Sequence, residues 1–197
     1  MSRPPAMIAC FGSAHRCLTQ MVRDRSGVGA VEFALIVPLL LVLYLGAFEL
    51  TMALGVSQRT TSSAGAIADI VARQQKTVTK AFLKTMPDVM NAIFAPTATT
   101  GYTLKITGIK VDANVKATVA WSWAQDGSKP YATGATVTLP NSMAAANAFF
   151  VHAELTMPHQ LVTYMTGFTG SSVSTITLAR DYYFRQRENG EIACSDC

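Results

Sequence analysis

The feature that most constrains this chain is a long apolar stretch near its N-terminus. From Phe33 to Leu54 the only charged residue is Glu49, and most of the others are Leu, Ala, Val, Ile, Phe or Tyr. A helix of this length covers about 30 Å, which matches the hydrocarbon core of a bilayer. A secretory signal has a shorter apolar region of roughly 7–15 residues, and the small-x-small match at 64–66 lies well beyond this stretch. We therefore expect a membrane-spanning helix.

The distribution of charge predicts the orientation of that helix. The net charge is +4, and the first 27 residues contribute +3 of it, from four arginines and one aspartate. Arg23 and Arg25 precede the span, and no basic residue follows it until Arg59. Positive charge on one flank of a span favours a cytoplasmic location for that flank. We expect the N-terminus in the cytoplasm, the C-terminal domain in the periplasm, and no nucleic-acid partner.

A glycine and a glutamate mark the start of the apolar helix. The basic leader ends at Gly27, Val28 follows, and Glu32 is the fifth residue after the glycine. This arrangement resembles the processing site of type IV prepilins, which implies cleavage after Gly27 by a prepilin peptidase. In that family the glutamate pairs with the new terminal amine of a neighbouring subunit. The alternative is that Glu32 stays hydrated at the cytoplasmic interface of the membrane.

The resemblance extends over the ordered run Arg-Ser-Gly-Val-Gly-Ala-Val-Glu-Phe-Ala-Leu-Ile-Val-Pro at residues 25–38. This run is similar to the opening of TadE-like proteins, the minor pseudopilins of the tight-adherence (Tad) pilus. The resemblance implies an assembly helix that uses Glu32, Phe33 and Pro38. It also implies three kinds of partner, namely the prepilin peptidase, other pilin or pseudopilin subunits, and inner-membrane lipid. A type II secretion pseudopilin fits less well, because Pro38 and the Ala-Val-Glu-Phe-Ala run favour the TadE-like pattern.

Three segments follow from these patterns: a leader at 1–27, a transmembrane helix at 28–56 and a periplasmic domain at 57–197. The apolar points Ile67 and Val71 predict that the membrane helix continues to about residue 72. Val78, Phe82 and Met86 recur at a spacing of four and predict one further amphipathic stretch. Thr85 and Pro87 are typical of a helix start, and this helix should end near Phe94.

Alternating apolar and polar residues predict strands in the rest of the domain. The alternating runs lie at 102–107, 115–123, 136–139, 149–157 and 174–184. Asp112, Ala113 and Asn114 suit a hairpin turn between the first two runs. Clean alternation favours an antiparallel sheet with one covered face. With helices on that face, the fold class is α+β.

The search for a catalytic site finds little. Of the candidates, His152 and Glu154 share one strand face and His159 follows Pro158, so these three side chains could form a metal or acid–base site. The alternation instead favours a polar, hydrated face for them. Trp121, Trp123 and Tyr131 could form a binding platform, but the tryptophans fall on the apolar side of their strand. We expect no enzyme activity, no cofactor and no metal site.

The four cysteines divide by compartment. Cys10 and Cys17 lie in the cytoplasmic leader, where thiols stay reduced. Cys194 and Cys197 lie on the oxidising side in the run Cys-Ser-Asp-Cys. A CxxC pair can indicate redox chemistry or half of a zinc site. A small disulfide between Cys194 and Cys197 is the favoured interpretation, and it would tie the tail or link subunits.

Two functions of different classes fit this sequence. The first is a TadE-like minor pseudopilin that helps to assemble an adhesive Tad pilus. The second is a signal-anchored periplasmic domain that binds a ligand or acts as a minor enzyme and is not cleaved as a prepilin. Cleavage after Gly27 and sensitivity to Glu32→Ala distinguish the first from the second.

Overall fold

The structure is a computed structural model that describes residues 27–97, 99–140, 143, 145–161, 174–187 and 190–197. The leader at 1–26, with Cys10 and Cys17, lies outside the described residues. The chain divides into two compact units, and the boundary falls between Phe48 and Glu49.

The first described element is the long helix α2, Val28–Ala72, which crosses the unit boundary as one continuous helix. It contains Pro38 and the whole apolar stretch. The expected continuation of the membrane helix as far as residue 72 is confirmed. A long apolar helix followed by a mostly antiparallel sheet with helices also confirms the α+β fold class.

A short strand and two short helices follow α2. They are β1 (Thr77–Val78), α3 (Lys80–Leu83) and α4 (Met86–Phe94). The single amphipathic stretch expected from Val78 to Met86 is therefore wrong, because the side-chain oxygen of Thr79 accepts from the N–H of Phe82 and starts a new helix there. The predicted helix from Thr85 to Phe94 is confirmed as α4, with Thr85 at its N-cap.

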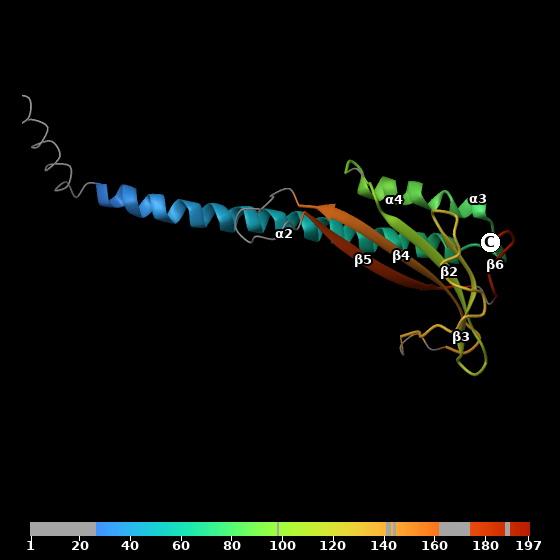
Figure 1. The fold of residues 1–197 in the computed structure, drawn as a ribbon. Helices are drawn as coiled ribbons and strands as arrows, with labels where there is room; N and C mark the ends of the chain where they lie inside the picture. The colour runs from blue at the N-terminus through green and yellow to red at the C-terminus, as the bar shows by residue number, and fades with distance from the viewer. Residues whose placement is uncertain (1–26, 98, 141–142, 144, 162–173, 188–189) are drawn as a thin grey trace, which may run out of the picture. The chain divides into compact units, whose positions relative to one another are not determined.

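The main sheet has four antiparallel strands in the order β3-β2-β4-β5 (Figure 1). Their bounds are β2 Thr103–Val111, β3 Ala117–Ala124, β4 Phe149–Gln160 and β5 Thr175–Arg185. The predicted turn at 112–114 joins β2 and β3. There the carboxylate of Asp112 accepts from the N–H groups of Asn114 and Lys116.

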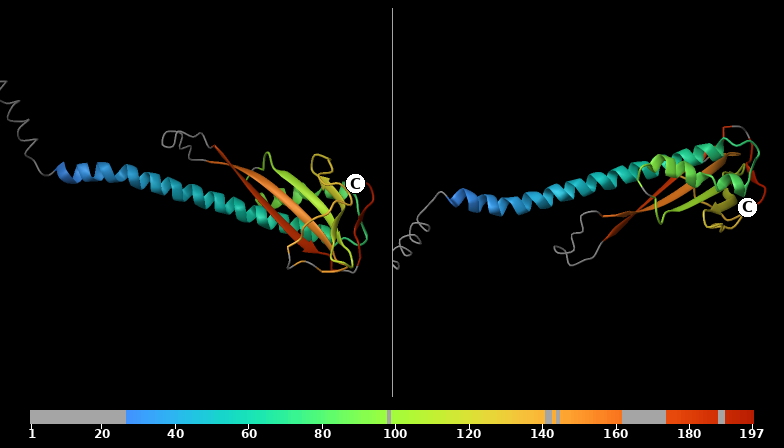
Figure 2. Two further views of the ribbon diagram at one scale, coloured as in Figure 1. Left: turned by 60° about the horizontal axis from the view of Figure 1, so that its bottom comes forward. Right: turned by 90° about the horizontal axis from the view of Figure 1, so that it is seen from above.

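One face of this sheet packs against α2 and α4, as the two views of Figure 2 show. The shared core takes side chains from α2, α4 and the four-stranded sheet, among them Ile67, Val71, Met90, Phe94, Leu104, Ile106, Trp123, Val151 and Leu155. Trp121 and Trp123 are buried in it, which confirms core packing over a binding platform. Gly108 is required beside Trp121, because a Cβ at residue 108 would lie 2.5 Å from the indole.

Two strand predictions fail on the other face of the sheet. A register shift between β2 and β3 at Gly108/Ile109 splits the single apolar face expected for residues 115–123. Trp121 stays in the main core, whereas Ala117 joins a second cluster with Ile109 and Phe150. The strand expected at 136–139 is also absent as a named strand among the described residues. Thr136 makes an isolated bridge to Thr118, and Val137 and Leu139 pack on the second cluster as a covering segment.

Candidate membrane anchor and assembly segment

The first unit offers an apolar helix surface that no part of the described chain covers. Its large side chains are exposed, with Phe33 at 69% and Leu35 at 73%. None of the most apolar part of the helix is buried. A core helix of a soluble protein would be mostly buried, so this surface requires another apolar environment. By length and composition, the described residues contain one helix able to cross a membrane.

The residues expected to act in processing and assembly lie at the start of this surface. Val28 is the first residue of α2 and is 53% exposed. Glu32 and Pro38 are exposed as well. Val28 and Glu32 are separated by about one helical turn, so both lie on the same side of the helix. A neighbouring molecule could reach these side chains without any rearrangement of the described chain.

Glu49, the only charge in the apolar stretch, has a partner that the sequence pattern does not reveal. Its Oε1 lies 3.3 Å from Nε2 of His159, near the end of β4. The two side chains are only 12% and 10% exposed. Glu49 thus has a partner within its own chain. His159 therefore does not join His152 and Glu154.

Beyond Glu49, polar side chains fasten α2 to the rest of the second unit. Arg59 donates to the carbonyl oxygen of Phe94 at 2.8 Å, at the end of α4. On the other side, Arg180 of β5 donates to the hydroxyl of Ser57 at 2.7 Å. These contacts begin just after the apolar stretch ends, so the helix changes its environment within a few residues.

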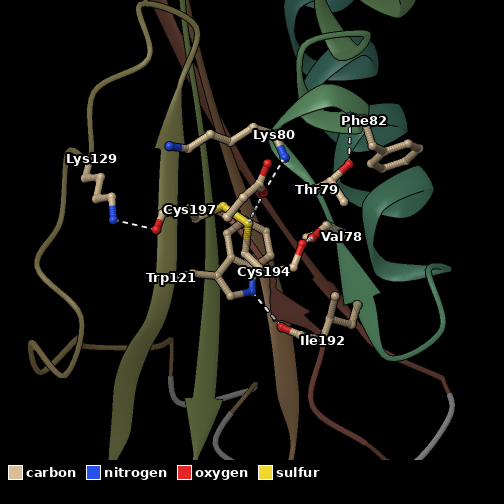
Figure 3. The surroundings of a disulfide bond; sticks show 11 residues. Val78, Thr79, Lys80, Phe82, Trp121, Lys129, Ile192, Cys194 and Cys197 are labelled. Atoms are coloured by element: carbon tan, nitrogen blue, oxygen red, sulfur yellow. Dashed lines mark hydrogen bonds between the residues drawn. A yellow bond between two sulfur atoms is a disulfide. The ribbon is translucent and has the colours of Figure 1, made fainter.

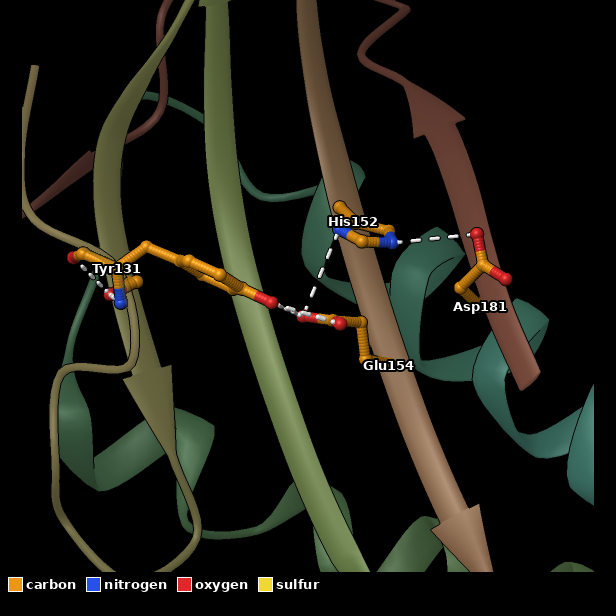
Figure 4. A network of polar contacts seen from close by, with 5 residues as sticks. Tyr131, His152, Glu154 and Asp181 are labelled. Carbon is orange, nitrogen blue, oxygen red and sulfur yellow. Dashed lines mark hydrogen bonds and ion pairs between the residues drawn. The ribbon is translucent and has the colours of Figure 1, made fainter. Parts of the chain in front are cut away.

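On the sheet face away from α2, His152 and Glu154 form a polar cluster with Tyr131 and Asp181 (Figure 4) and with Tyr183. Tyr131 donates from its hydroxyl to the carboxylate of Glu154, at 2.8 Å to Oε2. The ring of His152 stacks on that of Tyr183, with centroids 4.0 Å apart. Its Nε2 lies 3.7 Å from the Asp181 carboxylate and its Nδ1 lies 4.0 Å from Glu154. The segment carrying Tyr131 is thereby held against the sheet.

The expected hydration of this face is wrong for His152, whose exposure is only 9%. Burial lowers the pKa of His152, although Glu154 and Asp181 favour its charged form. Burial, followed by the hydrogen bond to Glu154, raises the pKa of Tyr131 to about 12. Burial thus favours the neutral form of His152, and the carboxylate of Glu154 accepts from the hydroxyl of Tyr131. The polar groups of the cluster contact one another and hold neighbouring segments together, which favours a structural role over ligand binding.

The C-terminal tail is held by a disulfide and by several hydrogen bonds (Figure 3). Cys194 and Cys197 are joined, with Cα atoms 5.5 Å apart. The strand β6, Ala193–Cys194, pairs in parallel with β1. The carboxylate of Asp196 accepts from the N–H of Lys80 at 2.7 Å. The indole N–H of Trp121 donates to the carbonyl oxygen of Ile192 at 2.6 Å. The tail thus fastens α3 to the end of the sheet.

Two of the hollows on the described part of the second unit bring no catalytic groups together. The larger, of about 600 Å³, is lined by residues around the β2–β3 turn, including Lys110, Asp112, Arg185 and Glu191. Lys110 and Glu191 already form an ion pair at 2.6 Å. A smaller groove of about 380 Å³ lies between α2 and the aromatic side chains of β5. Both hollows are open to solvent, and neither lining combines a nucleophile with a base that could activate it.

A comparison with known families decides the character of the N-terminal segment. Residues 27–69 match the model of a family described as TadE-like protein. This segment is TadE-like. The match confirms the resemblance seen in the sequence and fits a TadE-like component of the Tad pilus. No curated protein and no solved structure matches the chain.

The limits of the match correspond to structural features of the chain. It begins at Gly27, directly before the first residue of α2, and ends three residues before Ala72, where α2 stops. The matched residues therefore include the exposed apolar half of α2 and most of the half that packs on the sheet. The TadE-like family implies association with Tad pilus assembly. The sheet lies beyond the matched residues.

Proposed function

We propose that this protein is a minor pseudopilin of a Tad-type adhesive pilus. In this proposal α2 anchors it in the inner membrane, with the N-terminus in the cytoplasm and residues 57–197 in the periplasm. A prepilin peptidase cuts after Gly27, and residues from Val28 onward form the mature chain. The observation that carries the proposal is the TadE-like match, which starts at Gly27 and spans an uncovered apolar helix.

The surroundings of Gly27 support a role in recognition by a protease. A Cβ placed on Gly27 would meet no atom within 4 Å, and its backbone is not in the left-handed region. Neither packing nor backbone conformation in the described chain therefore requires a glycine here. A peptidase that accommodates an unbranched residue before the scissile bond supplies such a requirement.

The position of Glu32 supports a role in assembly. Cleavage after Gly27 would create a terminal amine at Val28, about one helical turn from this carboxylate. Glu32 is exposed on a helix surface that is otherwise apolar. In an apolar environment an unpaired carboxylate is costly, so pairing with the amine of a neighbouring subunit would stabilise one axial register. Other pilin or pseudopilin subunits are the partners in this step.

The test is the N-terminal mass of the protein purified from membranes. We expect the mature chain to begin at Val28, and we expect Gly27→Ala to leave the leader in place. Gly29→Ala is the matched control, because a Cβ on Gly29 also meets nothing within 4 Å. It should be cut normally.

An uncut N-terminus in the unmutated protein would overturn the pseudopilin proposal. The chain would then be a signal-anchored periplasmic domain, with α2 as a simple tether. Equal processing of the Gly27→Ala and Gly29→Ala variants would leave cleavage in place but contradict the role given to Gly27.

A further inference from the structure

One end of the sheet lies beside the first turns of α2 that belong to the second unit. His159 near the end of β4 pairs with Glu49, with 3.3 Å between Nε2 and Oε1. His159 is also the cross-strand partner of Ile176 in β5. Further along β5, Arg180 donates to Ser57 at 2.7 Å. Ile176 is therefore level with Glu49, and Arg180 is level with Ser57.

The strand and the helix stay together over a longer distance. A Cβ on Gly65 would lie 3.7 Å from the ring of Tyr182. The helix rises roughly 24 Å from Glu49 to Gly65, and the strand rises roughly 20 Å from Ile176 to Tyr182. The two elements thus run side by side in the same direction, and the order of contacts gives each strand residue a level on the helix.

Exposed apolar side chains lie on more than one side of the helix at the level of Ile176. Leu50, Met52 and Leu54 are 61%, 43% and 55% exposed, and all three belong to the second unit. Ile176 itself is 40% exposed. After Glu49 the next charged residue on α2 is Arg59. We call Leu50, Met52, Leu54 and Ile176 the basal surface.

The sequence of the adjoining strands is also free of permanent charge. Between Glu154 and Arg180 the chain contains no Asp, Glu, Lys or Arg. Thr175 and Thr177, which flank Ile176, are exposed hydroxyl-bearing residues. Among the described residues, the carboxylate at this level is that of Glu49, which is nearly buried against His159. The basal surface therefore presents apolar and neutral polar groups, as the boundary between lipid tails and headgroups requires.

The depth of this surface follows from the length of α2 and from the free edge of β5. From Val28 to Leu54 the helix rises about 40 Å, close to the thickness of a bilayer with its headgroups. Within the described part of the chain, β5 pairs with β4 alone, so its outer edge is open. Open strand edges do not occur in the hydrocarbon layer, because their backbone groups would lose hydrogen bonds there. A position in the headgroup layer agrees with the length of the helix and also leaves the open edge of β5 outside the hydrocarbon layer.

We propose that the basal surface rests in the headgroup layer of the membrane that α2 spans, so that the sheet itself contacts phospholipid. This rests on the membrane anchoring in the proposed function. The pair of Glu49 and His159 lets a charged residue of the helix lie at this level with its carboxylate shielded from lipid. In the sequence the apolar stretch runs on to Leu54 and so includes the helical part of this surface, which identifies lipid as the occupant.

The test uses the full chain in phosphatidylcholine vesicles, with Cys10→Ser and Cys17→Ser and one environment-sensitive fluorophore on a new cysteine. Ile176→Cys reports on the basal surface, and Thr177→Cys is a second position should the first variant unfold. Val115→Cys is the matched control, because Val115 is 44% exposed in the turn at the opposite end of the sheet. Leu41→Cys, on the exposed apolar helix, reports on anchoring.

We expect a nitroxide on the lipid headgroup to quench the label at 176 strongly and aqueous iodide to quench it weakly. The label at 115 should show the reverse. Equal responses at 176 and 115, with lipid-phase quenching at 41, would overturn the proposal and leave the basal surface to a protein partner in the pilus. A label at 41 that responds only to iodide would overturn membrane anchoring by α2 itself.

Discussion

The two halves of α2 follow opposite rules of burial. Residues 28–48 are rich in large apolar side chains, and these are exposed, as for Leu35 at 73%. Residues 49–72 are richer in Ser, Thr, Ala and Gly, and they supply every buried residue of the helix. The more apolar half is thus the one that the protein core does not use. Small side chains allow the second half to approach the sheet closely, whereas the large ones of the first half require lipid or neighbouring helices.

The largest test of this contrast compares one isoleucine from each half. Ile67→Ala should lower the free energy of unfolding of the second unit by about 3 kcal/mol, because it opens a cavity at a fully buried position. Ile36→Ala, at a position 51% exposed, should leave that free energy unchanged. Denaturant unfolding in detergent micelles measures both. Equal losses in the two variants would contradict the division of the helix.

The second test compares the two carboxylates of the helix. Glu49→Gln should cost about 1–2 kcal/mol of stability, since it removes the charge that pairs with His159 in a nearly buried position. Glu32→Gln, at an exposed position, should not change stability. Counts of pili should show the opposite order of effects. Here Glu32→Gln is the more harmful variant, because it should abolish assembly. A loss of stability in Glu32→Gln would show that this carboxylate serves the fold and not assembly.

The smallest expected effect is a pH dependence confined to the packed unit. Burial lowers the pKa of His152 below its usual 6.5, so the unfolded chain binds the proton more readily than the folded one. The stability that this histidine contributes is therefore complete above pH 6.5 and is lost as the pH falls through the lowered pKa. His152→Gln should flatten that part of the profile, measured by thermal melting between pH 8 and pH 5. Near pH 8 the contribution of His152 no longer changes with pH, so a difference between the two proteins confined to pH 8 would contradict this origin.

Local patterns were sufficient for much of the fold. The helix from the apolar stretch to residue 72, the helix α4 and four of the five strand runs were predictable, because each has its own periodicity. The run at 136–139 was not, although its alternation resembled that of the others. Its residues cover the second apolar cluster as an irregular segment, and alternation alone cannot distinguish a paired strand from an extended cover. The split of the face of β3 was equally hidden, because a register shift leaves no mark in the sequence.

For the candidate site, the sequence predicted which residues matter better than it predicted which side chains they contact. Glu32 and Gly27 were recognisable from their spacing, and the family match covers both. The partner of Glu49 was not recognisable, because His159 lies far along the chain and no local pattern connects them. His152 was expected on a hydrated face, but the ring of Tyr183 on the neighbouring strand stacks on it and it is buried. Both corrections concern contacts between segments that are distant in sequence.

The sequence by itself determined that this chain has a membrane-length helix, a basic flank and a TadE-like start, because these depend on composition and spacing along one continuous stretch. Tertiary structure alone decided which half of α2 enters the core and where the carboxylate of Glu49 finds its partner. It also decided that the end of the sheet lies level with the last apolar turns of the helix. Such contacts depend on how distant strands are brought beside the helix, and packing in three dimensions sets them.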